Sequence, residues 1–400
     1  MPWKTISIIG ERLRFVKEAL KAQKPFTQLC RLFGISRPAG YKWIDRFIQG
    51  GRRALQDQSR RPITSPARMG RIWIERLRWL RRRQSSWGAR KIAGYWRRIY
   101  PRGRRPCSRT LSRYLVEIGA VRHRRRRSPR GPQVMRAPLT AAIRPNQVWT
   151  VDFKGWFRTR DGQRVEPLTV RDLFSRFVLV VRLLPDQSWW RVKAVFMGLF
   201  IRYGVPEIIR VDNGGPFGSS GPAGLSRLSA WWSALGIRVE FIRPGHPEDN
   251  GAHEQFHRVL KAETTRPPSS NPRAQQRRLG RWVQEYNYVR PHEGLSQQIP
   301  AGFYRRSRRA YQVSEGKLRY AKRWEVRRVR SNGQIRWHGR KRFIGEAFVG
   351  RPVGLKRVSI DQSEVYFGSV LLGVLRESDA GGLRPSAYIR QRPTNPQQKV

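Results

Sequence analysis

Three apolar segments in the middle of the chain constrain its fold more than any other feature. They are rich in Val, Leu, Phe and Trp, and they span Val148–Phe157, Val165–Phe174 and Phe177–Leu184. The dipeptide Asp161-Gly162 marks a turn inside the first hairpin, and Ser175-Arg176 leaves room only for a tight second connection. We therefore expect three meandering strands at the start of this region.

The sequence after these strands alternates between helix and strand patterns. Helices are predicted over 188–203, 225–235, 250–264 and 272–289, and short strands over 207–211 and 238–242. A strand meander followed by alternating helices and strands indicates a mixed α/β domain. We place this domain at residues 146–305.

Residues 1–66 have the pattern of a helix-turn-helix DNA-binding domain followed by a linker. Gly34 can adopt the positive φ of a tight turn, and Ser36 is positioned to cap the second helix. In that geometry, the side chains that would face the major groove of double-stranded DNA are Ser36, Arg37, Ala39 and Lys42. An ordinary helical hairpin is the alternative that this pattern leaves open.

Four further segments complete the predicted organisation. Residues 67–121 are expected to form a second helical DNA-binding domain, followed by a basic linker at 122–145. Short strands separated by turn signals between 318 and 377 predict a small C-terminal β-barrel. Residues 378–400 are rich in Gly, Pro, Gln and Arg and are expected to be a flexible tail.

The charge of the chain points to its partner. It carries 83 Lys and Arg against 27 Asp and Glu, a formal net charge of +56. Such an excess repels itself unless a polyanion neutralises it, and cations that meet phosphates gain by counterion release. Nucleic acid is therefore the expected partner, with a ribosomal-type protein as the alternative. The core patterns above favour a folded DNA-binding protein.

Several classes of protein are excluded by what the sequence lacks. Its apolar runs are too short for a membrane span. Cys30 and Cys107 have no paired spacing, which argues against a disulfide framework or a structural zinc site and fits a reducing cytosol. The glycine pattern of a phosphate-binding loop is absent, so no nucleotide cofactor is expected.

Three carboxylates stand where catalysis is possible. Asp152 lies in a strand, Asp212 follows a strand and precedes a flexible turn, and Glu254 lies in the first turns of a helix. Together they can hold a pair of Mg²⁺ ions, which prefer oxygen ligands and support in-line displacement at phosphorus. Taken singly, the residues are equally compatible with a paired strand acid, a turn former and a solvated helix residue.

Other acidic and imidazole groups are given structural roles. Asp172 is interpreted as structural, pairing with Arg171 or Arg176, and the minor alternative is that it supports the residues that bind the metal. The histidines that could suggest a zinc site, which we disfavour because cysteine partners are missing, are His246, His253, His257 and His292.

Ordered motifs then give a family resemblance. TVDFKG, RVDNGGPF and RPGHPEDNGAHEQFHRVLKAE closely resemble the carboxylate motifs of DDE transposases with a retroviral-integrase-like catalytic core. RLSAWWSALGI and EYNYVRPHEGL stand in the matching order, and LCRLFGISRPAGYKW lies near the start. Over roughly residues 1–305, the chain resembles a bacterial insertion-sequence transposase.

The resemblance implies a fold and an activity. The prediction is a multidomain α/β protein with N-terminal helix-turn-helix modules, a ribonuclease-H-like mixed-sheet catalytic core and a small C-terminal β-barrel. The implied activity is DNA cleavage and strand transfer at element ends with two Mg²⁺ per site, which Mn²⁺ can replace. Asp152, Asp212 and Glu254 become the catalytic residues and metal ligands. A homodimer or higher synaptic complex, in a bacterial cytoplasm and associated with the nucleoid, is expected.

The third carboxylate needs a choice between two glutamates. Glu248 follows Asp212 by 248 − 212 = 36 positions, a spacing familiar in this superfamily, whereas Glu254 follows it by 42. The family's glutamate stands just after an Asn-Gly pair and opens a helix, which is Glu254 here. The extra length is assigned to a surface loop at 218–224. We choose Glu254.

Basic residues near Glu254 are candidate DNA contacts. Arg258 and Lys261 share its helix face, and a solvated basic face is the equally weighted alternative. Gln255 stands where the family often has arginine. Two other functions remain open: a helix-turn-helix regulator whose core is an inactive relic, and a metal-dependent nuclease without strand transfer.

Overall fold

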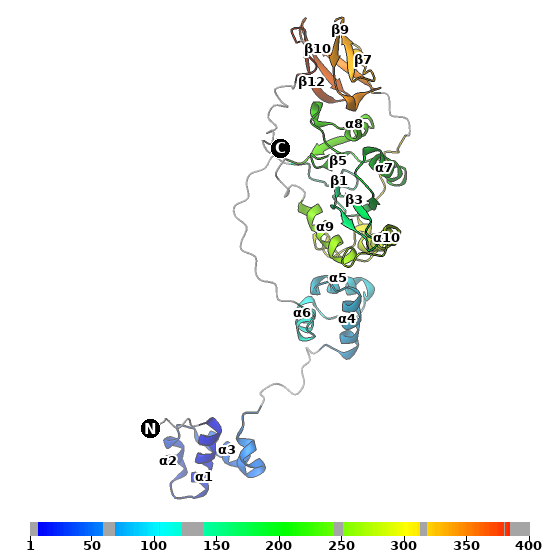
Figure 1. Ribbon diagram of the computed structural model, residues 1–400. Coiled ribbons are helices and arrows are strands. Elements are labelled where there is room, and N and C mark those ends of the chain that lie inside the picture. Colours follow the sequence, from blue (N-terminus) through cyan, green and yellow to red (C-terminus); the bar gives the residue numbers. More distant parts are fainter. Residues whose placement is uncertain are drawn as a thin grey trace. The chain divides into compact units, whose positions relative to one another are not determined.

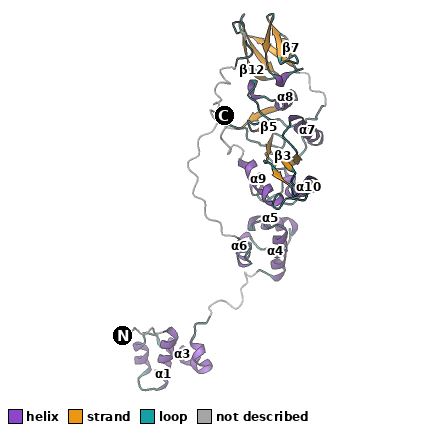
Figure 2. Ribbon diagram, in the orientation of Figure 1, coloured by secondary structure: helices purple, strands orange, loops and turns teal. Residues whose placement is uncertain are grey.

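The computed structural model describes residues 7–58, 69–103, 105–121, 139–243, 251–312, 318–379 and 381–384. These residues fall into two compact units, one within residues 1–70 and the other within residues 71–400 (Figure 1). The strands that the structure describes all belong to the second unit (Figure 2). None of the described helices is both long and apolar enough to cross a membrane.

The first unit is a helix-turn-helix fold. Its helices are α1 (Ile8–Leu20), α2 (Phe26–Leu32) and α3 (Arg37–Gly50), followed by a 3₁₀ turn, η1 (Gly51–Leu55). Phe15, Leu29 and Leu55 lie in its buried core. Gly34 has a φ of 60° in the turn between α2 and α3, where a Cβ would be strained. Ser36 caps α3 by accepting a hydrogen bond from the Ala39 amide, at 3.4 Å. Both predicted turn features are therefore confirmed.

The second compact unit begins with another group of helices, which we call the second helical unit. They are α4 (Arg71–Arg83), α5 (Ala89–Ile99) and α6 (Ser108–Glu117), in the region predicted to be helical. Trp87, Ile92 and Leu111 are completely buried among them. This second helical unit therefore has a hydrophobic core of its own.

The central domain is built on one mixed sheet. Its strands are β1 (Val148–Phe153), β2 (Phe157–Arg158), β3 (Arg164–Asp172), β4 (Val178–Leu184), β5 (Ile208–Val211) and β6 (Arg238–Phe241). The meander β1-β3-β4 is antiparallel, with β2 pairing to the first residues of β3, whereas β5 and β6 add to the other edge of β1 in parallel. The mixed sheet is the one that the sequence predicts.

Helices cover both faces of this sheet. They are α7 (Trp189–Tyr203), α8 (Arg227–Ala234), α9 (Gly251–Thr264) and α10 (Pro272–Tyr288) (Figure 1). One hydrophobic cluster joins α7 and α8 to Trp149 and Val151 of β1. A separate cluster joins α9 and α10 to Val178 and Val181 of β4. The two clusters define a three-layer α/β domain.

The second helical unit is joined to the central domain through the segment after α10. The Arg98 guanidinium donates to the carbonyl oxygens of Tyr288 and Val289, at 3.1 and 3.2 Å. Gly94 packs so closely on Gln297 that an added Cβ would come within 2.7 Å of the Gln297 Cβ. We call these contacts the α5 joint.

The C-terminal region differs from its prediction. Its strands are β7 (Glu325–Arg328), β8 (Gln334–Trp337), β9 (Arg340–Phe343), β10 (Pro352–Arg357), β11 (Gln362–Phe367) and β12 (Val370–Arg376). In the described residues they form two open sheets, β12-β11-β10-β7 and the hairpin β8-β9, so the small β-barrel at 318–377 is not confirmed. Its core is instead completed by residues from the central domain, including Leu225 and Ala230. That contact covers apolar side chains that barrel closure would otherwise bury.

Two segments predicted as a linker and a tail contain residues with specific hydrogen bonds. Thr140 lies inside the segment 122–145 that is predicted as a linker. It donates hydrogen bonds to Glu240 and accepts hydrogen bonds from Arg210 and Arg238 at the edge of the sheet. The predicted tail 378–400 likewise begins as ordered chain, because Leu383 and Arg384 pair with the backbone of Phe343 and Val374. Composition indicates flexibility but not such backbone pairing. The remaining linker residues 122–138 and tail residues 385–400 lie outside the described residues.

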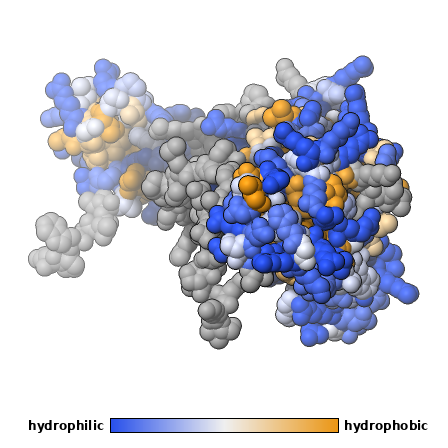
Figure 3. Space-filling model, turned by 90° about the horizontal axis from the view of Figure 1, so that it is seen from above, coloured by the Kyte–Doolittle hydropathy of each residue, from blue (hydrophilic) through white to orange (hydrophobic). Residues whose placement is uncertain are grey.

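The surface is strongly polar. Hydrophilic side chains dominate the face in Figure 3, with isolated apolar patches. Three half-exposed tryptophans, Trp79, Trp156 and Trp190, each lie beneath an arginine guanidinium at 4.2–4.9 Å from the ring centroid. These pairs shield aromatic surface while keeping the charge in water.

Candidate active site

Strand alternation sets which side chains of β1 and β3 meet α9. Trp149 and Val151 point into the α7 side of the sheet, so Thr150 and Asp152 point to the opposite side. The antiparallel register places Asp152 opposite Thr169 on β3. Polar side chains from two strands therefore gather under α9.

Asp152 lies near the carboxyl end of β1, as predicted. Its side chain is 25% exposed, and its Oδ2 lies 3.6 Å from the Nδ1 of His257. Burial raises the pKa of Asp152 to about 7, and the charges of Asp212 and, less strongly, Glu254 add to the increase. The carboxyl group is thus poorly stabilised as an anion by its protein surroundings alone.

Asp212 directly follows β5, the parallel neighbour of β1. Its Oδ1 is buried and has no hydrogen-bond partner among the residues that the structure describes. Burial raises the pKa of Asp212, while a hydrogen bond from the Gly214 backbone opposes this effect. A buried carboxylate oxygen without a partner is costly unless a cation or a proton reaches it.

Glu254 lies in the first turn of α9 and is exposed. Its charge contributes to the raised pKa of Asp152, so all three predicted carboxylates share one electrostatic environment. The competing candidate, Glu248, lies outside the described residues.

Two histidines of α9, His253 and His257, contact side chains of the paired strands β1 and β3. These contacts were not predicted from the sequence. The Thr169 hydroxyl lies 2.7 Å from His253 Nε2, 2.8 Å from His257 Nε2 and 2.9 Å from the Asp152 carbonyl oxygen. Because one hydroxyl has one proton, donation to the carbonyl requires both imidazoles to donate through Nε2. The other nitrogen of His253 then accepts from the Thr150 hydroxyl, at 3.0 Å. The i, i+4 spacing of these histidines was the available signal.

This arrangement leaves His257 and Asp152 facing each other without a proton to share. Burial lowers the pKa of His257 to about 3, with Lys154 and Arg171 adding to the effect, so its ring is neutral. In the tautomer above, its Nδ1 lone pair faces the Asp152 carboxylate. Either a proton on Asp152 or a bound cation would relieve this contact.

The residues fit a divalent cation. The charges of Asp212 and Glu254 raise the pKa of Asp152, and Asp212 Oδ1 has no hydrogen-bond partner among the described residues. Ligand atoms of Asp152, His253 and His257 also lie within 4.8 Å of one another. Both ring nitrogens of His253 already contact threonine hydroxyls, however, so oxygen ligation by the carboxylates is the better fit. His246 lies outside the described residues, and His292 lines a different cavity.

The predicted DNA contacts lie at two places. Ser36, Arg37 and Lys42 are exposed at the start of α3, where Ala39 is half-buried. Arg258 and Lys261 are exposed on α9 and share a helix with Glu254. Burial lowers the pKa of Lys154, and the charge of Lys261 lowers it further. The basic face of α9 therefore continues towards the end of β1.

Asp172 has a structural environment, but its partners differ from those predicted. Its Oδ1 accepts from the Asn146 amide at 2.7 Å, and its Oδ2 accepts from the Ser175 amide and hydroxyl at 2.8 and 2.5 Å. No ion pair joins Asp172 to Arg171 or Arg176 among the described contacts, but the charge of Arg171 is one of the effects that oppose the rise of its pKa on burial. The Asp172 carboxylate stabilises the β3–β4 turn through two backbone N–H groups and the Ser175 hydroxyl. Such partners cannot be recognised from residue types alone.

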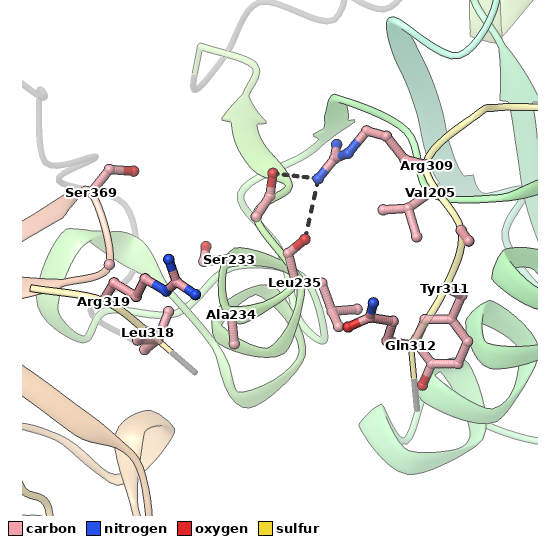
Figure 4. Close-up of a pocket in the computed structure, with 13 residues that line it drawn as sticks. Val205, Ser233, Ala234, Leu235, Arg309, Tyr311, Gln312, Leu318, Arg319 and Ser369 are labelled. Carbon is pink, nitrogen blue, oxygen red and sulfur yellow. Dashed lines mark hydrogen bonds between the residues drawn. The ribbon is translucent and has the colours of Figure 1, made fainter. Parts of the chain in front are cut away.

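A separate cavity of about 390 Å³ lies between the central domain and the C-terminal region (Figure 4). Its lining includes Arg309, whose guanidinium turns to the carbonyl oxygens of Leu235 and Gly236, at 3.2 and 2.9 Å. None of the three carboxylates lines it. The Arg309 guanidinium is used for hydrogen bonds to backbone carbonyl oxygens. The cavity does not belong to the candidate site.

The charge on Asp152 makes stability depend on pH when divalent metal is removed. The pKa of Asp152 is about 7 in the folded state and 3.8 in its ordinary state. The contribution of this group to the free energy of unfolding is therefore greatest below pH 4 and is lost as the pH rises towards 7. In EDTA, Asp152→Asn should therefore stabilise the protein more at pH 8 than at pH 5, by about 1–2 kcal/mol after allowance for solvent screening. Urea unfolding followed by tryptophan fluorescence measures the difference.

The matched control is Asp161→Asn, which removes one charge from an exposed turn. Adding Mg²⁺ at pH 8 should reverse the order, because only the wild type keeps the carboxylate. A variant that is less stable than the wild type in EDTA at pH 8 would contradict the proposed strain at Asp152.

Comparison with protein families gives matches along most of the chain. A helix-turn-helix domain family matches residues 11–63. Two integrase core domain families match residues 142–247 and 235–300, which together contain the three carboxylates. The C-terminal domain of IS481-family transposases matches residues 324–376.

Two curated relatives come from bacterial insertion elements. The uncharacterized 39.2 kDa protein of insertion element IS476 of Xanthomonas euvesicatoria is 29% identical over 202 residues. That alignment covers 47% of this chain but only 53% of the relative, about half its length. The uncharacterized 31.7 kDa protein of insertion element IS407 of Burkholderia multivorans (strain ATCC 17616 / 249) is 30% identical over 195 residues. Here the alignment covers 48% of this chain and 67% of the relative.

Among solved structures, similar chains occur in retroviral integrases. A chain of the simian T-cell lymphotropic virus intasome matches with a TM-score of 0.38 and 17% identity, covering 60% of this chain and 82% of that one. The catalytic core domain of BIV integrase matches with a TM-score of 0.31 and 20% identity, covering 40% and 93%.

Proposed function

Because this chain belongs to the insertion-sequence transposases that carry an integrase core domain, we propose that it cuts DNA at the ends of its own element and joins the freed 3′ ends to target DNA. The single observation that supports this proposal is that the charges of Asp212 and Glu254 both raise the pKa of Asp152, which lies near the carboxyl end of β1. These three residues would hold Mg²⁺ or Mn²⁺, two ions per site. When bound, the metal supplies charge stabilisation at the reacting phosphate and lowers the pKa of an attacking water or hydroxyl.

The residues around the carboxylates prepare the site before DNA arrives. The Thr169 hydroxyl donates to the Asp152 carbonyl oxygen and accepts from His257, so the backbone at Asp152 is held in place before DNA binds. Asp212 is held at a strand end by the turn that follows β5. Glu254, exposed on α9, completes the set from a different element. A water attack at the element's end phosphate and then attack by the freed 3′-hydroxyl can use the same carboxylates in turn.

DNA recognition is assigned to the basic surfaces. The start of α3 would read the element end in the major groove, and the second helical unit would extend that contact. Arg258 and Lys261 would hold the DNA backbone beside Glu254. Two element ends must meet for strand transfer, so a homodimer or higher synaptic complex is expected, on the nucleoid of a bacterial cell.

The test is strand transfer in vitro. The full chain is incubated with labelled element-end DNA, a plasmid target and Mg²⁺ or Mn²⁺, beside a reaction that contains EDTA. Joined product that forms only with metal supports the proposal. Cleavage without joining on authentic ends would indicate a nuclease, and tight binding with neither product would indicate an inactive relic that only binds DNA.

Recognition by α3 has its own test. Replacing Arg37 and Lys42 together by Ala should weaken binding to an element-end duplex about tenfold and reduce the slope of log K against log salt by about 2. Both side chains are exposed, so the fold should be retained. Fluorescence anisotropy at several salt concentrations measures both quantities. The control is the Lys17→Ala, Lys24→Ala double variant, also exposed and equal in charge. Equal losses in the two double variants would refute a specific role for α3.

A further inference from the structure

A second cavity, of about 330 Å³, lies between the second helical unit and the central domain. Its walls include Lys91 of α5, Arg171 of β3, Tyr286 of α10, and Arg176 and Arg290 from connecting segments. None of the three carboxylates lines it. The motif EYNYVRPHEGL, which the proposed activity leaves without a role, supplies part of the wall.

Positive charge accumulates in this cavity. Four of its lining residues are cations, whereas the only acid in the lining, Glu293, is exposed and pairs with Arg90 at 2.7 Å. Burial lowers the pKa of Lys91 and the charge of Arg290 lowers it further, while the charges of Glu263 and Glu293 partly oppose these effects. The surroundings therefore disfavour additional positive charge and favour an anion.

Two of the guanidinium groups are incompletely paired. Arg171 and Arg290 are each only 2% exposed, yet among the described residues the Nη2 of Arg171 and the Nε of Arg290 have no hydrogen-bond partner, although Tyr286 interacts with the charge of Arg171. Arg290 uses its Nη2 on Glu263, at 2.5 Å, and the acid beside Arg171, Asp172, is committed to the β3–β4 turn. Buried N–H groups without partners are rare and costly, and guanidinium groups pair best with oxyanions.

The cavity lies beside the carboxylate site and not within it. Gln255 and Val259, one turn apart on α9, line the cavity, whereas Glu254 and Arg258 occupy the neighbouring face of the helix. Consecutive helical residues are about 100° apart, so the two faces point in different directions. A ligand in the cavity would contact α9 without occupying the metal ligands.

We propose that this cavity binds a phosphate group, held by Arg171, Arg290, Lys91 and Arg176. The phosphate can come from a DNA backbone that crosses between the two domains or from a free phosphate in solution. The chemistry of recognition is the same for both sources. The proposal does not depend on transposition, since phosphate binding needs neither metal nor a cut DNA end.

The experiment is isothermal titration of the full, metal-free chain with inorganic phosphate at constant ionic strength. Binding to the wild type should be weakened about tenfold by Lys91→Gln combined with Arg176→Gln. Neither residue is fully buried, so these changes avoid the deep guanidinium groups on which folding could depend. The control, Arg182→Gln with Lys193→Gln, removes two charges from outside the cavity and should bind phosphate like the wild type.

A second titration with a short duplex identifies the source. If duplex DNA competes with phosphate in the wild type, and its affinity falls in the cavity variant, the backbone supplies the group. If phosphate and duplex bind together, the cavity takes a free phosphate. The proposal is overturned if the cavity variant binds phosphate as tightly as the control. That outcome would leave the strand-transfer assay unaffected, so the two proposals fail separately.

Discussion

Asp212→Asn is expected to abolish both cleavage and joining in the strand-transfer assay, a loss of more than about 1,000-fold, or about 4 kcal/mol of transition-state stabilisation. The substitution keeps the shape of the side chain but replaces an anionic oxygen with an amide. Asp212 Oδ1 is buried without a hydrogen-bond partner among the described residues, so the substitution changes a carboxylate well placed to bind a cation. Gel analysis of labelled products over a time course measures the rates of both steps.

Two comparisons make this result specific. DNA affinity, measured by anisotropy, should stay at the wild-type value because α3 is in the other compact unit. Asp161→Asn, in the exposed turn of the same domain, should change the rate by less than about twofold. Joining by the Asp212→Asn variant at a wild-type rate would remove this residue from the proposed metal site.

The second large effect separates the two glutamates. Glu254→Gln should also reduce strand transfer more than about 1,000-fold, whereas Glu248→Gln should retain activity within about fivefold. The physical reason is that the charge of Glu254 adds to the raised pKa of Asp152, which supports a place for this carboxylate near the strand ends. Glu254 is exposed and packs against no core cluster, so the substitution should not unfold the domain.

The pair is its own control, because each variant removes one glutamate charge from the same region of the chain. Circular dichroism and DNA binding should be alike in the two variants. If Glu248→Gln is inactive and Glu254→Gln is active, the choice based on the Asn-Gly pair is wrong, and the spacing of 36 residues after Asp212 identifies the ligand.

The mixed sheet and its helices could be predicted because local patterns determine them. The apolar runs that became β1, β3 and β4, and the tight connection at Ser175-Arg176, favour neighbouring strands whichever fold surrounds them. The cap at Ser36 follows from the residues next to it. The same local patterns correctly predicted strands in the C-terminal region. They carried no information on whether the first and last strands pair, which is what a barrel requires.

The parts of the site that escaped prediction depend on contacts across long stretches of sequence. His253 and His257 were considered only as zinc ligands, because their contact with Thr169 joins residues more than 80 positions apart. The cavity at Arg171 and Arg290 likewise needs four elements to come together. In sequence, those arginines are two among 83 basic residues, and only burial distinguishes them.

The α5 joint has a practical consequence for handling a chain of this charge. Removing bound nucleic acid calls for concentrated salt, which weakens phosphate contacts steeply with each released counterion. The joint rests on Gly94 packed against Gln297 and on Arg98 bound to two carbonyl oxygens, which are neutral acceptors. Screening by salt acts weakly on such contacts. Removal of DNA by a high-salt wash should therefore leave the second helical unit bound to the central domain. The protein should then bind DNA again after dilution of the salt.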